Sequence, residues 1–471
     1  QPTDLKAYSE KSDKDHDPLK DPAIDQSLLG QHYAVTLPYT VVKVTDGYVV
    51  KNTAVQIVNN VRKKTNTVSN PLKTINPKKD VTVKVGGAPV DGKSVYLNST
   101  FLYQLDSSIL PADRAYQKIA NWGITDQLDP AYDKATGQWA VYAARDLYRG
   151  GEAIARKGER IAGSGFDSSR LGGDMFTANI DPSTGLVDIQ ATQAYLDLVS
   201  ADDAHEQGWR AYVQVTRVKV TDRHENVFTE HVNGKDLTSN IVWTRTPDLT
   251  PGIDIEKWDK KSGFPKGDRD DSKDALDGAR DGDVIVFTLT NTSKDDSGHG
   301  AWFKASDLKL EDHTIVGDGE VKDLKYPDNW STLVLKPGDS VEVTGTLTGF
   351  TKDRHTDRAK VTGTPLVECP VVDKDPFGDA SGKPSTGGEA GDGPRQVTVG
   401  DRTLCEDTPV ESNTDDWNGR RSLLGETGSA ILPVGVGALL MAGIGAAVVM
   451  VRRRKSAHDD TDAALMPRHA A

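Results

Sequence analysis

Three sets of residues along the chain combine an amine, a carboxyl and an amide or second carboxyl in the same order. Each set begins with a Lys on an alternating, strand-like segment, continues with an Asp that closes another such segment, and ends with an Asn or Asp before a Pro. The sets are Lys6, Asp46 and Asn66; Lys79, Asp126 and Asn240; and Lys257, Asp312 and Asp357. A pattern that recurs in this way predicts a repeated structural unit.

Side chains of these types can form an amide bond with one another when they meet in a dry core. Burial lowers the pKa of an amine and raises the pKa of a carboxyl, so both can be neutral together. A neutral amine is a nucleophile, and a protonated Asp can polarise a carboxamide and help ammonia leave. The product is a crosslink between the first and last strands. In the third set, Asp357 would lose water instead of ammonia.

Period-two counting supports this chemistry best for the second set. Lys79 shares a strand face with Val81, Val83 and Val85, and a Lys on an apolar strand face is unusual. By the same counting, Asp126 and Asn240 lie on the apolar faces of their segments. We therefore expect all three side chains to point into one core.

Two alternatives stay open at this point. Asp106 is a second candidate for the acid, although it falls on the opposite face from Tyr103 and Leu105. Each residue of the three sets also suits an ordinary site, because β proteins commonly carry a Lys on an edge strand, an Asp in a turn and an Asn facing solvent.

The elements that must position these side chains are predicted to be antiparallel strands. From Val35 onward the chain consists of short alternating runs of Val, Thr, Ile and Tyr separated by Gly, Pro, Asn and Asp, as in residues 212–218. This pattern is typical of Ig-like β-sandwiches. Helical periodicity is scarce, and residues 188–199 form the one candidate short helix. The fold class is therefore all-β, with tandem sandwich domains.

Several segments resemble the C-terminal domains of the antigen I/II family of surface adhesins. They are residues 76–81, 91–93, 99–108 and 110–116. The resemblance implies a β-sandwich with an intramolecular Lys-Asn isopeptide bond in the wall-proximal stalk of an adhesin. It also implies that Lys79 is the nucleophile, Asp126 the catalytic acid and Asn240 the electrophile. Residues 252–368 resemble a different bacterial surface repeat, whose known members are mostly spacers.

These observations divide the chain into five parts. We expect a partial or reduced β-sandwich at 1–75, an isopeptide-forming sandwich at 76–247, a spacer sandwich at 252–368, a flexible wall-spanning linker at 369–422 and a sorting signal at 423–471.

The last part carries an uncharged apolar run at 430–451, long enough to cross a hydrocarbon core of about 30 Å as a helix. The basic residues 452–455 follow it, so the orientation is N-out and C-in. Before it stands a pentapeptide that resembles a sortase signal, although its second residue is Gly where Pro or Ala is usual. Its residues are Leu424, Gly425, Glu426, Thr427 and Gly428, and cleavage is expected after Thr427. A simple membrane-anchored protein is the alternative.

Composition excludes other classes of protein. A net charge of −13, without a basic cluster outside the anchor, excludes nucleic acid as a partner. Cys369 and Cys405 are the two cysteines, and an exported chain permits a disulfide between them, with two free thiols as the alternative. Phosphate-binding Gly loops, zinc helices and nucleophile elbows are absent from the sequence. The acidic stretch 268–283 offers oxygen ligands for calcium, but a solvated loop is favoured, so we expect no metal and no cofactor.

The sequence thus predicts the stalk and anchor of an extracellular, cell-wall-anchored adhesin of a Gram-positive bacterium. It is not an enzyme apart from autocatalytic crosslinking. Its expected partners are a sortase, peptidoglycan, the membrane through 430–451, and a host glycoprotein or other surface ligand bound by a head upstream of Gln1. Alternatives are the spacer of a surface enzyme, whose catalytic head would precede Gln1, and a pilus subunit.

Overall fold

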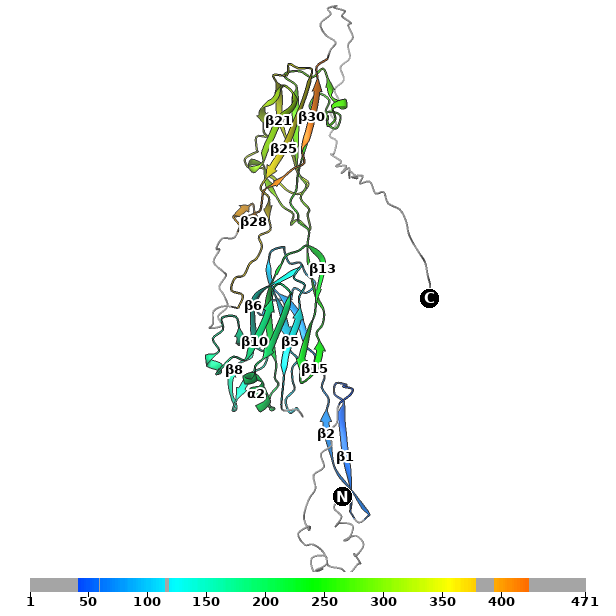
Figure 1. Ribbon diagram of the computed structural model, residues 1–471, viewed down its shortest axis with the longest axis vertical. Helices are drawn as coiled ribbons and strands as arrows, with labels where there is room; N and C mark the ends of the chain where they lie inside the picture. Colours follow the sequence, from blue (N-terminus) through cyan, green and yellow to red (C-terminus); the bar gives the residue numbers. More distant parts are fainter. Residues whose placement is uncertain (1–40, 59, 115–117, 378–393, 423–471) are drawn as a thin grey trace, which may run out of the picture. The chain divides into compact units, whose positions relative to one another are not determined.

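A computed structural model describes residues 41–58, 60–114, 118–377 and 394–422 (Figure 1). Lys6, the pentapeptide 424–428 and the apolar run 430–451 lie outside the described residues. Within the described part, none of the helices has the length and apolarity that a membrane crossing requires. The predicted all-β architecture is confirmed for the described residues, whose sheets are almost entirely antiparallel.

The first unit contributes one hairpin to the described residues. Strand β1 (Val49–Val58) pairs antiparallel with β2 (Val61–Pro71), shown in blue in Figure 1. Asn60 has a left-handed φ of 63° where the chain reverses. Nearly every residue of both strands is exposed. The partial sandwich predicted for 1–75 is therefore represented here by two strands, without a core of their own.

The second unit is a sandwich of two five-stranded sheets. One sheet has the order β3 (Lys78–Thr82), β4 (Thr100–Asp106), β12 (Trp209–Arg217), β6 (Asp133–Ala143) and β9 (Arg160–Gly163). The other has the order β10 (Phe176–Asp181), β11 (Leu186–Ala191), β5 (Trp122–Gln127), β14 (Phe228–Val232) and β15 (Lys235–Thr238). Two further pairs are β13 (Thr221–Asn226) with β16 (Val242–Thr246), and β7 (Leu147–Arg149) with β8 (Glu152–Ala155).

The helix predicted at 188–199 is shorter and starts later. Residues up to Ala191 belong to β11, and α2 (Gln193–Ala201) follows, with Tyr195, Leu196 and Val199 buried. Its buried residues join the large core of the second unit, which is centred on aromatic side chains such as Trp122 and Trp209. A short 3-10 turn, η2 (Ser169–Leu171), lies between β9 and β10.

The third unit is a second sandwich. Its sheets are β17 (Ile253–Asp259), β19 (Val284–Asn291), β24 (Ser340–Thr348) and β22 (Glu320–Lys325) in one layer, and β18 (Leu276–Asp277), β30 (Asp415–Arg420), β25 (Arg354–Gly363) and β21 (Lys309–Gly317) in the other, with β29 (Val410–Glu411) on β25. Smaller pieces are η3 (Ser272–Asp274), η4 (Ala305–Asp307), the pair β20 (Phe303–Lys304) and β23 (Val334–Leu335), and the sheet β26 (Leu366–Val367), β28 (Arg402–Glu406) and β27 (Gln396–Val399).

The prediction of a flexible linker at 369–422 is wrong for residues 394–422. Strand β30 pairs with β25 along its whole length, and the two lie side by side in Figure 1. Its Trp417 is fully buried in the third core. The segment is polar overall, but one large aromatic side chain on the inward face of a strand can bury enough surface to hold that strand against a sandwich core. The third unit therefore extends beyond Glu368 to residue 421.

Candidate functional site

Lys79 lies on β3 at the edge of one sheet of the second unit and is 1% exposed. Its Nζ donates a hydrogen bond to Oδ2 of Asp126, which lies on β5 of the facing sheet and is also 1% exposed. The amine thus spans the two layers of the sandwich. Val81 shares the buried face of Lys79, whereas Val83 is exposed because β3 ends at Thr82.

The surroundings of this pair are apolar. Nζ of Lys79 lies 4.5 Å from the centroid of the Tyr103 ring and 5.6 Å from that of Phe228. Burial lowers the pKa of Lys79, and the charge of Asp126 opposes that effect. Burial raises the pKa of Asp126, opposed by Lys79. Both shifts favour the uncharged forms, which is the condition for a nucleophilic amine beside a protonated acid.

A third residue of this core, Asn226, was missed by the sequence analysis. It ends β13, is 7% exposed, and lies close enough to Asp126 to lower the pKa of that carboxyl through its carboxamide. Its Oδ1 accepts a hydrogen bond of 2.7 Å from the Val227 amide, but its Nδ2 makes no hydrogen bond of normal geometry. The structure therefore brings together Lys79, Asp126 and Asn226.

Asn240 does not point into the core as predicted; it is exposed. Its Oδ1 accepts a hydrogen bond of 2.9 Å from the Lys79 amide, and its Nδ2 donates one of 3.0 Å to the Lys79 carbonyl. The Asn240 side chain therefore bonds the main chain of Lys79 and not its amine. The prediction failed because residues 239–241 lie between β15 and β16, so the period of two counted back from Val242 does not apply.

Asp106, the alternative acid, is not close to the Lys79 amine. Its carboxylate binds the guanidinium of Arg210, and Nη2 of Arg210 lies 3.0 Å from Oδ2. In the register of β3 and β4 it stands opposite Lys78, one position from the partner of Lys79. It therefore faces away from the core that holds Asp126.

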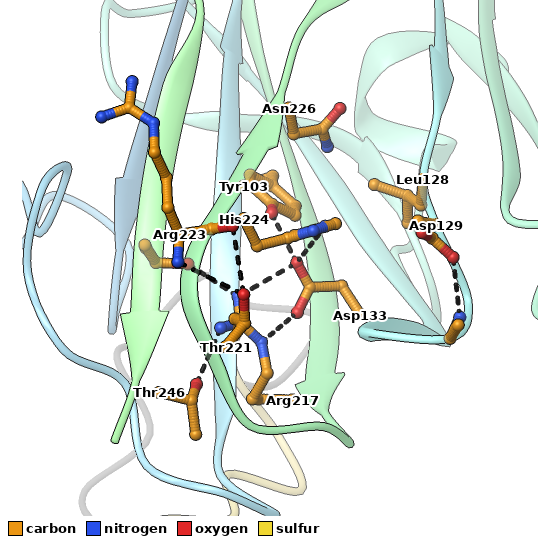
Figure 2. A network of polar contacts seen from close by, with 12 residues as sticks. Tyr103, Leu128, Asp129, Asp133, Arg217, Thr221, Arg223, His224, Asn226 and Thr246 are labelled. Atoms are coloured by element: carbon orange, nitrogen blue, oxygen red, sulfur yellow. Dashed lines mark hydrogen bonds and ion pairs between the residues drawn. The ribbon is translucent and has the colours of Figure 1, made fainter. Parts of the chain in front are cut away.

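A second buried network lies beside this site (Figure 2). Asp133 accepts hydrogen bonds of 2.6 Å from Tyr103 Oη and 2.6 Å from Arg217 Nε, and His224 Nε2 lies 3.3 Å away. Arg217 also donates to the hydroxyls of Thr244 and Thr246 on β16. Asp133 and Arg217 are fully buried. Because Tyr103 touches both Lys79 and Asp133, this network fixes one wall of the site.

An open groove of about 620 Å³ reaches the site from outside. Asn226 lines the groove together with its chain neighbours Glu225 and Val227, at the junction of β13 and β14. Thr125 and Gln127 of β5 also line it. Its lining mixes polar and apolar side chains. The groove provides a route by which a small leaving group from Asn226 can reach solvent.

The third set of residues also converges in a core. Lys257 on β17 is fully buried, and its Nζ lies 2.5 Å from Oδ1 of Asp312 on β21 and 2.5 Å from Oδ1 of Asp357 on β25. His355, two positions before Asp357 on the same strand face, is 1% exposed, and its Nε2 lies 3.1 Å from Asp357 Oδ2. As in the second unit, the amine bridges two sheets.

The charges of this cluster are unevenly distributed. Burial raises the pKa of Asp312 to about 6, opposed by Lys257. Burial alone would also raise the pKa of Asp357, but Lys257 and His355 hold it below the ordinary value of an Asp. Asp312 is therefore the carboxyl that more readily holds a proton.

The first set has no such cluster in the described residues. Asp46 is exposed, and its Oδ1 accepts a hydrogen bond of 2.5 Å from the Thr74 amide. Asn66 is exposed on β2. Lys6 lies outside the described residues. Asp46 therefore lies in a turn and binds the main chain after β2, so it has the turn position that the sequence left open as an ordinary role.

Cys369 and Cys405 form a disulfide. Val367, close before Cys369, pairs with Cys405 in the small sheet of β26, β28 and β27. The bond therefore ties the end of β26 to β28. It lies within the ordered part of the third unit, not within a flexible linker.

Carboxylates of the acidic stretch considered for calcium bind other groups of the protein. Asp277 pairs with Arg420, and Asp268 lies with Glu256 and Asp415 in a group whose ligand atoms are within 4.8 Å of one another. Burial and a hydrogen bond with Asp270 raise the pKa of Asp415 to about 9.

Comparisons with known proteins match two parts of the chain. Residues 76–247 match a family model described as cell surface antigen C-terminus, and residues 1–72 match one described as cell surface antigen I/II C2 terminal domain. The resemblance predicted from the sequence is thereby confirmed for the second unit. The first unit, predicted only as a partial sandwich, matches a domain of the same kind of surface antigen.

Three relatives are each similar over less than half of the chain. The aggregation substance of Enterococcus faecalis is 35% identical over 224 residues, which are 46% of this chain and 16% of that protein. Among solved structures, the C-terminal domain of the Streptococcus pyogenes antigen I/II-family protein AspA is 26% identical, with a TM-score of 0.37, over 42% of this chain and 55% of that one. The BspA C-terminal domain of Streptococcus agalactiae is 22% identical, with a TM-score of 0.37, over 43% and 59%.

Proposed function

The chain carries C-terminal domains of the antigen I/II family of cell-surface antigens, and from that premise we propose that it is the stalk of a surface adhesin, stabilised by an amide crosslink in its second unit. One observation carries the crosslink: the amine of Lys79, the carboxyl of Asp126 and the carboxamide of Asn226 meet in a buried core. The pKa shifts of Lys79 and Asp126 support the neutral forms that the chemistry needs.

The reaction uses only these three residues. The neutral Nζ of Lys79 attacks Cγ of Asn226 and forms a carbon-nitrogen bond, while the Asp126 acid donates its proton toward the carboxamide. A proton of the attacking amine passes to Asp126, the bond to Nδ2 breaks, and ammonia leaves. One amine and one carboxamide thus become one secondary amide and one ammonia.

The expected gain is mechanical and thermodynamic. Lys79 lies on the first strand of the sandwich and Asn226 on a late one, so the bond closes most of the unit into a covalent loop. A closed loop of this length removes entropy from the unfolded chain worth about 5 kcal/mol. A stalk that transmits tension between a cell and a surface benefits because its strands can no longer be peeled apart.

Peptide mapping of the full chain tests the crosslink. We expect the Lys79 and Asn226 peptides to be joined, with the loss of one ammonia. Lys79→Ala, Asp126→Ala and Asn226→Ala should each leave them separate. Asn240→Ala and Asp106→Ala are matched controls that should keep the bond, because neither residue approaches the amine. Separate peptides in the unmutated protein would overturn the proposal, and loss of the bond only in Asn240→Ala would restore the electrophile first inferred from the sequence.

We further propose that the stalk is anchored through Thr427, by a sortase that joins it to peptidoglycan, and that residues 430–451 hold it in the membrane beforehand. A host glycoprotein or other surface ligand would be bound by a head upstream of Gln1. Thr427→Ala should move the protein from the purified cell wall to the membrane fraction. Wall linkage that is unchanged in this variant would reject the pentapeptide as the signal.

A further inference from the structure

One sheet of the second unit carries apolar side chains outside the main core of the sandwich. Leu102 on β4, Tyr212 on β12 and Ala140 on β6 form a buried cluster that is separate from that core. They are neighbours across the strands, since Tyr212 pairs with Ala140, and Gln214, two positions after Tyr212, pairs with Leu102. The outer face of an antiparallel sheet commonly meets water and is polar. An apolar patch on that face therefore indicates a surface that receives another segment of protein.

The segment 370–377 occupies this surface in the molecule itself. Phe377, 5% exposed, completes the apolar cluster, whereas Val372 is 54% exposed and takes no part in it. The guanidinium of Arg160 lies 5.5 Å from the centroid of the Phe377 ring. The carboxylate of Asp375 is close enough to Arg160 to interact with its charge. The side chains that hold the segment are therefore an aromatic ring and an acid, two positions apart.

The main chain of the segment is held by polar groups beside the cluster. The Val371 carbonyl accepts a hydrogen bond of 2.7 Å from the Thr100 amide. The Asp373 amide donates one of 2.9 Å to Thr100 Oγ1, and the Asp373 carbonyl accepts one of 2.6 Å from Gln214 Nε2. Main-chain bonds of this kind suit a peptide of any sequence, so the selectivity comes from the side chains. The surface therefore fits a short peptide in which an acid stands two residues before a Phe.

We propose that this surface also binds residues 370–377 of a second copy of the chain, so that two neighbouring copies exchange the segment and become paired. A second copy presents the same acid and the same Phe, and its segment makes the contacts that the molecule's own segment gives up. The intramolecular hold rests on one large side chain and a few main-chain bonds, so it opens in a fraction of the molecules. In dilute solution the chain's own segment competes best, because its effective concentration is high. Exchange is therefore expected where copies are crowded together.

A fluorescent peptide of residues 370–377 tests the surface, with the full chain carrying Phe377→Ser as its receptor, because the variant's own segment no longer fills the cluster. Fluorescence anisotropy should show that this peptide binds about 30-fold more tightly than one with Ser in place of Phe377. A peptide with Ser in place of Val372 is the matched control and should bind as well as the unmodified one, because Val372 is exposed. The unmutated chain should bind more weakly than the variant, since its own segment competes. Equal binding of the peptides with Phe and Ser at position 377, or no binding at all, would overturn the proposal.

A mixture of two full-chain variants tests the second copy as the occupant. Phe377→Ser keeps the surface and disables the segment, whereas Leu102→Ser keeps the segment and disables the surface. Analytical ultracentrifugation should show dimers in the mixture and monomers in each variant alone. Gln214→Ala, which removes the hydrogen bond to the Asp373 carbonyl and so loosens the segment, replaces Leu102→Ser if that variant does not fold. Peptide binding without dimers in the mixture would overturn exchange between copies. Neither measurement depends on the crosslink proposed for the second unit.

Discussion

At the residue scale, the buried cluster of the second unit has a feature that links its energetics to its chemistry. The group that would leave in the proposed crosslink, Nδ2 of Asn226, makes no hydrogen bond of normal geometry. An unmet buried polar group raises the free energy of the uncrosslinked fold. Expulsion of that group as ammonia removes the cost, so packing and covalent chemistry act in the same direction.

Another buried acid, Asp415, has a raised pKa because of its position in the fold. One of its oxygens accepts a hydrogen bond from the Lys257 main-chain amide. Burial, first, and a hydrogen bond with Asp270, second, raise the pKa of its carboxyl to about 9, and the charge of Glu256 acts in the same direction. The folded third unit therefore keeps a proton at Asp415 that the unfolded chain releases near the ordinary pKa of an Asp, 3.8.

This proton makes the stability of the third unit fall as the pH rises. The folded pKa lies above the unfolded one, so the contribution is complete in acid and is lost between about pH 4 and about pH 9, by at most about 1.4 kcal/mol for each pH unit. Asp415→Asn, which cannot ionise, should flatten this slope and raise the thermal midpoint at pH 8 more than at pH 5. Calorimetry of the full chain at both pH values measures it, and equal shifts at the two would refute a proton held by Asp415.

At the element scale, sequence patterns located the strands of the second unit well and failed where a strand ends. Lys79 and Asp126 could be found because each lies inside a regular alternating strand. Asn240 was misplaced because the chain leaves strand geometry between β15 and β16. Asn226 could have been found by counting back two residues from Phe228, but β13 and β14 belong to different sheets, and the crossing between them is not visible in an alternating pattern.

Strand β30 shows a different limit of sequence reasoning. Composition alone made residues 370–416 look unable to bury a core, since Gly, Ser, Asp, Glu and Pro are frequent among them. In the structure, Trp417 enters the core of the third unit, Val397 and Leu404 form a small core cluster with Leu366, and β25 supplies main-chain partners for β30. Such pairing depends on a strand far away in the sequence, and no local pattern records it. Tertiary context overrode local composition here.

The ion pair between Arg217 and Asp133 ties β12 and β6 to the hydroxyls of β16 (Figure 2). Arg217→Met should cost about 3–5 kcal/mol, because it leaves the buried Asp133 without a cation. Arg156→Met is the matched control: its side chain, which pairs with Asp146, is 66% exposed, so the change should cost far less than Arg217→Met. Urea denaturation of the full chain compares them.

The double variant Arg217→Met with Asp133→Leu refines this prediction. With both charges gone, no uncompensated ion remains in the core, so the double variant should be more stable than Arg217→Met alone. The loss of unfolding free energy in the double variant could instead equal the sum of the losses in the two single variants. That result would mean that the hydrogen bonds to Tyr103, Thr244 and Thr246, rather than the charge pair, stabilise this region.

At the scale of the whole molecule, the segment 370–377 follows the disulfide of the third unit and binds the second unit. The Val371 amide donates a hydrogen bond of 3.0 Å to Ser99 Oγ, and the Asp373 amide donates one of 2.9 Å to Thr100 Oγ1. Phe377, 5% exposed, packs with Leu102, Ala140 and Tyr212, residues that lie outside the main core of the second unit. The two sandwiches are therefore joined by more than the chain between Thr246 and Ile253.

Phe377 should supply most of the affinity of this segment, since burial of a Phe side chain is worth about 2 kcal/mol. Phe377→Ser should therefore speed hydrogen exchange of the Val371 and Asp373 amides about 30-fold, because the segment would open more often. Val372→Ser is the control, as Val372 is 54% exposed and its loss should leave exchange unchanged. Reduction of the Cys369–Cys405 disulfide in the Phe377→Ser variant should accelerate exchange further, since it frees the other end of the segment. Equal exchange in Phe377→Ser and the unmutated protein would show that the disulfide alone positions these residues.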